Sequence, residues 1–231
     1  MNSIKRHLVR ISKLKKHVMH PLLHKIHKHH NISKKTLFYV KEYGPHTNIA
    51  KTIIKESIKI LLLASIISSI GGLAIEHIKT IFVSIIPLII ILPTLNDMVG
   101  DYSTIISSKF STMLHEGRLY KVWWKERAVK KLFLQISIIA LFTTLISTMA
   151  ALMLSMLYSY KVDIIMALKI SLISVIDVAF IVSILFFVAI ISGLYLYKKK
   201  EDPSNFLIPI TTSIADFGNM FILAILVLIF F

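Results

Sequence analysis

Asp216 is the residue that most needs a chemical explanation, because it is a carboxylate inside the long apolar run that ends at Phe231. A carboxylate at the centre of a membrane helix costs about 2.5–3.5 kcal/mol on insertion scales. At steps of three and four residues, one helical face places these residues together: Asn205, Pro209, Thr212, Asp216 and Asn219. Oxygen-bearing side chains around one acid predict a path for a cation.

A second polar group follows Leu95 and contains Asn96, Asp97 and Asp101. The two aspartates are one helical turn apart and so face the same way. Two carboxylates this close repel each other unless a cation lies near them or one is protonated. The alternative is that a membrane span ends at Leu95 and both acids are solvated. The next basic cluster begins only at Lys109, which favours the first interpretation.

Two further acids lie in or next to apolar runs. Asp177 is near the middle of a long apolar segment, with Ser174 one turn away or a polar group on another helix as its expected partner. An ionisable residue inside a membrane is a functional candidate, and a pore role and a structural hydrogen bond are equally compatible with the sequence. Glu56 begins the first apolar run and is either a residue of the cytoplasmic mouth or an interfacial acid paired with Lys55 or Lys59.

The apolar segments that carry these residues predict an all-α membrane protein with five spans. The chain is 55% hydrophobic, its mean hydropathy is +0.74, and it has no cysteine, which excludes disulfides and thiolate metal sites. The first span is predicted at about 56–75, the second starts near residue 78, and the others are predicted at about 132–158, 164–197 and 202–231. Pro87 and Pro93 predict a kinked or broken second helix, as found at transport sites. Asp202-Pro203 is a helix start.

The net charge of +15 is distributed in a way that indicates membrane topology rather than nucleic-acid binding. Basic clusters occupy residues 1–55, 109–131 and 198–200, and they alternate with loops that carry one lysine each. Because positive loops stay in the cytoplasm, this pattern predicts a cytoplasmic N-terminus and an outside C-terminus.

Residues 1–50 are predicted to form a basic, histidine-rich cytoplasmic segment and linker, and residues 51–231 the transmembrane domain. Apolar residues recur at helical spacing in 1–35 between Lys, Arg and His, which predicts an amphipathic helix bound to anionic lipid. A disordered basic tail is the alternative. The histidines on one broad face are candidates for a transition metal: His17, His20, His24 and His27.

The last apolar segment carries a pattern that resembles a known family. The pattern D-P-x-N-x-x-x-P-x-x-T-S-x-x-D, from Asp202 to Asp216, resembles the last helix of MgtE-type magnesium transporters, especially the archaeal and eukaryotic solute-carrier branch. The stretch Pro93–Gly117 resembles the family's second helix, with Gly100-Asp101 where the family has Gly-Asn. The resemblance covers about residues 56–231.

MgtE-type domains are homodimers of five-helix subunits whose ion path lies on the twofold axis between the second and fifth helices. The resemblance therefore implies that Asp216 binds the ion, with the main-chain carbonyl of Thr212, and that Asp101 lines the path. Mg²⁺ prefers oxygen ligands and keeps several waters, which suits Asp216 and Thr212 facing Asp101 and Asp97. We expect no counterpart of the large cytoplasmic sensing domains of bacterial members, and the extra acid at Asp101 extends the expected ions to other divalent cations.

These features predict a non-enzymatic, multi-pass plasma-membrane transporter or channel for divalent cations, above all Mg²⁺. Two alternatives come from other classes. An intramembrane aspartyl protease needs two facing aspartates, one in Gly-x-Gly-Asp, but Met98 precedes Val99-Gly100-Asp101. A non-transporting membrane scaffold, docked on lipid through residues 1–35, would tolerate replacement of Asp216.

Overall fold

The computed structural model describes residues 49–116, 123–199 and 203–231, and every regular element in these ranges is a helix. In chain order the elements are α4 (Ile49–His77), α5 (Lys79–Ser84), α6 (Ile86–His115), the 3₁₀ turn η1 (Trp123–Lys125), α7 (Arg127–Leu157), α8 (Ile164–Lys199) and α9 (Pro203–Phe230). The predicted all-α class is confirmed. The predicted amphipathic helix in 1–35 and its histidines lie outside the described residues.

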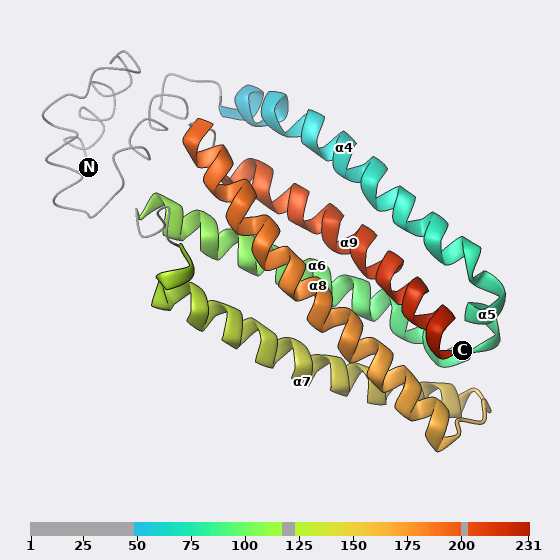
Figure 1. Ribbon diagram of the computed structural model, residues 1–231. Coiled ribbons are helices and arrows are strands. Elements are labelled where there is room, and N and C mark those ends of the chain that lie inside the picture. The colour runs from blue at the N-terminus through green and yellow to red at the C-terminus, as the bar shows by residue number, and fades with distance from the viewer. Residues whose placement is uncertain (1–48, 117–122, 200–202) are drawn as a thin grey trace, which may run out of the picture.

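Three helices, α6, α8 and α9, pack against one another at the centre of the bundle. Helix α7 packs on α6 and α8, whereas α4 packs along α9 on the opposite side (Figure 1). Consecutive long helices run in opposite directions, so α6 and α8 are parallel to each other and α9 runs back between them and α4. This arrangement gives α9 contacts on several sides and makes it the best-placed helix for a shared site.

The second predicted span is broken, but the break comes before both prolines. Helix α5 ends at Ser84, and Ile85 separates it from α6, which has Pro87 in its first turn. A proline is well tolerated there because its missing N–H would have no partner within the helix. Pro93 lies inside α6 without ending it, and the helix continues to His115. The helix therefore does not end at Leu95, and Asp97 and Asp101 lie on it as exposed side chains.

Helix α7 begins at Arg127, earlier than the predicted start near residue 132. Arg, Ala and Lys favour helix, so the helix extends past the apolar run into its basic flank. Just before it, Trp123 packs edge to face against Phe187 of α8, and Trp124 is exposed. Tryptophan favours the boundary between lipid and water, so this pair suits an interfacial anchor.

Four of the described helices are long and apolar enough to cross a membrane: α4, α7, α8 and α9. Helix α6 has 30 residues, which span about 45 Å at 1.5 Å per residue. Its apolar N-terminal half is followed by Asn96, Asp97 and Asp101, which lower its hydropathy. Among the three central helices, α6 is thus the least suited to lipid by composition.

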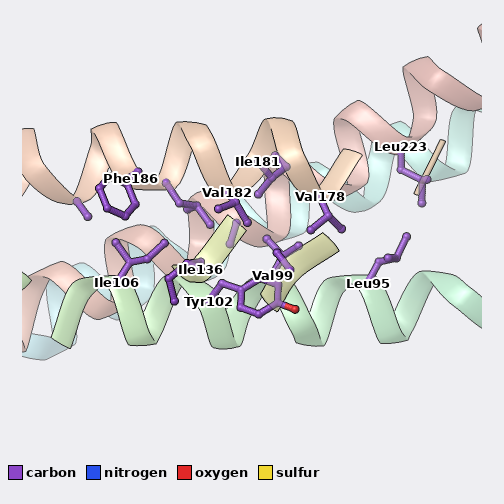
Figure 2. Packing of buried hydrophobic residues seen from close by; sticks show 14 of the residues in the cluster. Leu95, Val99, Tyr102, Ile106, Ile136, Val178, Ile181, Val182, Phe186 and Leu223 are labelled. Atoms are coloured by element: carbon purple, nitrogen blue, oxygen red, sulfur yellow. The ribbon is translucent and has the colours of Figure 1, made fainter. Parts of the chain in front are cut away.

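The centre of the bundle is a continuous apolar core. Figure 2 shows Val178, Ile181 and Val182 of α8 facing Val99 and Tyr102 of α6, and all five side chains are buried. Phe110 and Phe186 extend this contact with an edge-to-face ring pair at 5.0 Å between centroids. The core fixes the height of α6 against α8 and leaves the side of α6 toward α9 for polar residues.

Candidate functional site

Asp216 lies where α9 crosses α6, and it is half-buried between them. Asn96 of α6 donates from Nδ2 to Asp216 Oδ1 at 3.1 Å. Asn219, one turn further along α9, is fully buried and donates from Nδ2 to Asn96 Oδ1 at 3.3 Å. Two amides thus form a chain that ends on the carboxylate and fixes the direction of one of its oxygens.

Helix α4 supplies the second donor to this carboxylate, the hydroxyl of Ser68, which lies 3.2 Å from Asp216 Oδ2. The close approach depends on Gly71, one turn along α4. A Cβ atom added at Gly71 would lie 2.9 Å from the Cα atom of Phe217, so the two backbones nearly touch. The sequence analysis did not identify Ser68; the signal was its three-residue spacing from Gly71, which places two small residues on one face.

Small and polar side chains continue the contact between α6 and α9 away from Asp216. A Cβ atom added at Gly100 would lie 3.9 Å from Thr212 Cγ2, and Ser103 Oγ lies 3.5 Å from Thr212 Oγ1. One turn further, the hydroxyls of Ser107 and Thr211 are 2.7 Å apart and fully buried. We call this contact the polar seam: Asn96, Gly100, Ser103 and Ser107 of α6 with Thr211, Thr212, Asp216 and Asn219 of α9.

A second set of polar residues lies on α6 beside the polar seam. We call it the acidic stripe, and it consists of Asp97, Asp101, Thr104, Ser108 and Thr112, spaced by four, three, four and four residues. All but the half-buried Thr104 are exposed. Each residue of a helix is turned about 100° from its neighbour, so Asp97 lies about a quarter turn round from Asn96. The acidic stripe and the polar seam are therefore adjacent faces of one helix.

Most of the predicted site residues fall into two groups, one in the polar seam and one on the acidic stripe. Asp216, Asn96 and Asn219 are joined by hydrogen bonds, and Thr212 lies next to them. Asp97 and Asp101 lie on the adjacent acidic stripe, so the oxygens of Asp216 bond to Ser68 and Asn96 rather than to these acids. The described residues contain no group of three or more His, Asp or Glu side chains arranged to hold a metal.

Asp177 makes no hydrogen bond to either group. It is buried on α8, and neither of its carboxylate oxygens has a hydrogen-bond partner. Ser174, one of the two expected partners, does not bond to it, because the Ser174 hydroxyl donates to the main-chain oxygen of Ile170 at 2.8 Å. A hydroxyl inside an apolar helix bonds readily to the carbonyl one turn back. Glu56 and Asn205 fall on α4 and α9, but their side chains lie outside the described part of the structure.

The arrangement around Asp216 is suited to a cation that passes. Its two bonding partners, a hydroxyl and an amide, are neutral, and the ion pair of Lys79 with Glu76 lies away from the site, at the far end of α4. Neutral donors orient a carboxylate without cancelling its charge. The charge of Asp216 thus remains available to a bound cation, whereas a lysine or arginine in the same place would compete with it.

Comparison with known families gives one match. The family model MgtE, described as a divalent cation transporter, matches residues 92–226, more than half of the chain. Comparisons with curated proteins and with solved structures return no match. The matched range runs from the polar part of α6 through α7 and α8 to α9, and so includes both the polar seam and the acidic stripe. The chain belongs to the MgtE family of divalent cation transporters.

Proposed function

We propose that two copies of this chain form a transporter or channel for divalent cations, chiefly Mg²⁺, with the ion path between α6 and α9 of both copies. The observation that carries this proposal is the exposed acidic stripe beside Asp216. The large side chains exposed elsewhere on α4, α7 and α8 are mainly apolar, as lipid contact requires. Two carboxylates on the outside of the same bundle are costly in lipid, so this face of α6 must meet water or protein.

A second copy satisfies that requirement and completes the site. Twofold symmetry places the same patch of each subunit against the other, so each acid of the polar seam and the acidic stripe occurs twice along a shared path. Asp216 then contributes two carboxylates and Asp101 two more. The pairs of carboxylates supply the few strong oxygen ligands that a divalent cation needs, although each chain alone contributes only one acid at each position.

The chemistry of this path suits a partly hydrated ion. Mg²⁺ sheds water reluctantly and is bound by one or two carboxylates while several waters remain. Hydroxyls and amides of the polar seam can contact those waters. The carbonyl of Thr212 keeps one lone pair free even within a helix, since a carbonyl oxygen has two, and this oxygen can join Asp216 as a ligand.

The proposal also includes the orientation of the chain in the membrane and the force that drives the ion inward. With the basic N-terminus inside a plasma membrane, a divalent cation moving inward gains about 4.6 kcal/mol per 100 mV, twice the single-charge value. The basic segment 1–35 holds this side to anionic lipid. The extra acid at Asp101 strengthens binding of divalent cations and extends the accepted ions beyond Mg²⁺.

The test is Mg²⁺ flux into liposomes that contain the wild type, Asp216→Ala or Glu76→Gln under an imposed membrane potential. We expect flux from the wild type and from Glu76→Gln, because Glu76 is an exposed acid that pairs with Lys79 outside the site. We expect Asp216→Ala to lose at least tenfold. Folded protein that passes no Mg²⁺, Mn²⁺ or Co²⁺ would overturn the proposal in favour of a membrane scaffold. Undiminished flux through Asp216→Ala would show that the ion path does not run past Asp216.

A further inference from the structure

Asp177 is a buried acid that the ion path does not use. Its side chain is 0% exposed, and neither carboxylate oxygen has a hydrogen-bond partner. Its neighbours on the same helix, Ile173, Val178 and Ile181, are equally buried and apolar. An unpaired charge in such surroundings costs far more than a neutral acid. The packing therefore requires the uncharged form of this side chain.

The contacts of α8 with α9 show what Asp177 faces. A Cβ atom added at Gly218 would lie 2.7 Å from Ile181 Cδ1, and Lys169 Nζ donates to the main-chain oxygen of Phe230 at 2.7 Å. Ile181 and Lys169 are twelve residues apart on α8, and Gly218 and Phe230 are twelve residues apart on α9. The two antiparallel helices therefore stay in register between these contacts. Asp177 is one turn from Ile181 on the same face of α8. It therefore faces α9 at about the height of Ile222.

Asn219 is one turn of α9 from Ile222, and its side chain has an acceptor oxygen that a protonated Asp177 could bond to. Among the described residues, the only other buried side-chain oxygen without a partner is Asn219 Oδ1, and the side chain is 0% exposed. An unprotonated carboxylate and an amide oxygen are both acceptors, so neither can satisfy the other. A proton on Asp177 supplies the missing donor, directly or across one water. Asn219 Nδ2 leads on to Asn96 and from there to Asp216.

Among the described residues, no cationic side chain bonds to Asp177. On α6, Asp97 and Asp101 are exposed and Tyr102 bonds to Thr143. The charged or titratable residues on the packed helices are Asp97, Asp101, Tyr102, Lys109 and His115 of α6, Arg127, Lys130 and Lys131 of α7, and Asp216 of α9. On α8 itself, Lys169 bonds to the carbonyl of Phe230 two turns away.

We infer that Asp177 is a proton-binding site: the packed bundle holds a proton on this side chain and releases it only when α8 and α9 separate. An aspartate in the unfolded chain is ionised at neutral pH. The packed state therefore binds one more proton than the unfolded state. By linkage, raising the pH favours unfolding. Because α9 also carries Asp216, proton release at Asp177 disturbs the cation site through Asn219.

The first test is infrared spectroscopy of the full chain in liposomes at neutral pH. The C=O stretch of a protonated carboxylic acid is separate from the bands of a carboxylate. We expect this band in the wild type, in Ser174→Ala and in Asp216→Asn, and its loss in Asp177→Asn. Ser174 is the matched control, equally buried one turn away on α8. Absence of the band from both the wild type and Asp216→Asn would overturn the inference, even if Asp177→Asn does not fold.

The second test is the thermal midpoint in detergent as a function of pH. Asparagine keeps a hydrogen-bond donor and does not titrate, so Asp177→Asn should fold. Its Tm should fall less steeply with rising pH than the Tm of the wild type, because it has no proton to lose at this position. Equal slopes in the two proteins would refute the site. The same pair compared in Mg²⁺ flux shows whether the proton acts on transport, with the wild type losing flux at high pH and Asp177→Asn keeping it. That arm alone rests on the proposed function; the infrared and thermal results stand whether or not Asp216 carries ions.

Discussion

At the scale of single residues, Asp216 shows how a membrane protein keeps a carboxylate in use. Its oxygens accept one hydrogen bond from an amide of α6 and one from a hydroxyl of α4. Both donors are neutral, so they orient the charge and leave it uncancelled. Hydrogen bonds to charged groups contribute about 1.5–3 kcal/mol, which helps to offset the cost of placing the acid between helices.

Ser68→Ala is expected to raise the Mg²⁺ concentration for half-maximal flux by roughly tenfold, with little change in maximal flux. The variant removes one of the two donors that orient Asp216, and loss of a partner that orients a ligating carboxylate typically costs about 10–100-fold in affinity. The measurement is flux against Mg²⁺ concentration in liposomes.

Ser69→Ala is the matched control for that variant. The hydroxyl of Ser69 is exposed and donates to the main-chain oxygen of Ser65, so it makes no contact with the site. Its flux curve should overlay that of the wild type. If Ser69→Ala weakened Mg²⁺ binding as much as Ser68→Ala, the bond to Asp216 would not be the cause.

At the scale of elements, the position of α4 depends on one backbone contact. Gly71 lets α4 approach the Cα atom of Phe217, and this brings Ser68 to Asp216 one turn away. Contact between α8 and α9 at Gly218 is different, because the atom in the way there is the end of the flexible Ile181 side chain. Close helix packing through small residues is common in membranes, where van der Waals contact drives association.

Gly71→Ala is expected to lower stability by about 1–3 kcal/mol, the usual cost of overpacking, and to reduce Mg²⁺ flux. A methyl group there would meet backbone that cannot rotate away, so α4 must move off α9 and take Ser68 with it. Thermal unfolding of the purified protein in detergent, followed by Trp fluorescence, measures the first effect.

Gly72→Ala provides the control on the next residue, where an added Cβ meets no atom within 4 Å. Alanine favours helix over glycine by about 1 kcal/mol, so this variant should be as stable as the wild type or slightly more so. A Gly71→Ala protein with unchanged Tm and flux would show that α4 is not held by this contact.

At the scale of the whole molecule, the distribution of exposed side chains separates two kinds of surface. Most of the outside of the bundle is apolar and suited to lipid. The acidic stripe on α6 is the exception among the described long helices, and it lies beside Asp216 of α9. In the proposed dimer, this polar face meets the second subunit and lines a hydrated path between the two.

Disulfide cross-linking tests that assembly, and the chain is a convenient background because it has no cysteine. Ser108→Cys places a thiol on the acidic stripe, near the proposed twofold axis. We expect it to form a covalent dimer under mild oxidation in the membrane, seen as a band of twice the monomer mass. Phe142→Cys, on the exposed apolar face of α7, should stay monomeric under the same conditions. The reverse pattern would place the interface on α7.

The sequence by itself determined the helical class, the spans and the residues of most chemical interest. Apolar runs long enough to span a bilayer have few alternatives to helix, because every backbone N–H and C=O must bond within the segment. The same reasoning made Asp216, Asp97, Asp101 and Asp177 stand out, since ionisable groups are costly there. The start of α9 at Pro203 followed from local chemistry alone.

Only the tertiary structure decided which of these residues meet. Helical periodicity gives the face of one helix, whereas partners on other helices depend on the order and height of packing. Ser68 is 148 residues from Asp216, and Asn96 is 120 residues from it. No local pattern links such positions. The close approach of α4 to α9 at Gly71 brings Ser68 to Asp216. The same packing left Asp177 buried on α8 without a hydrogen-bond partner.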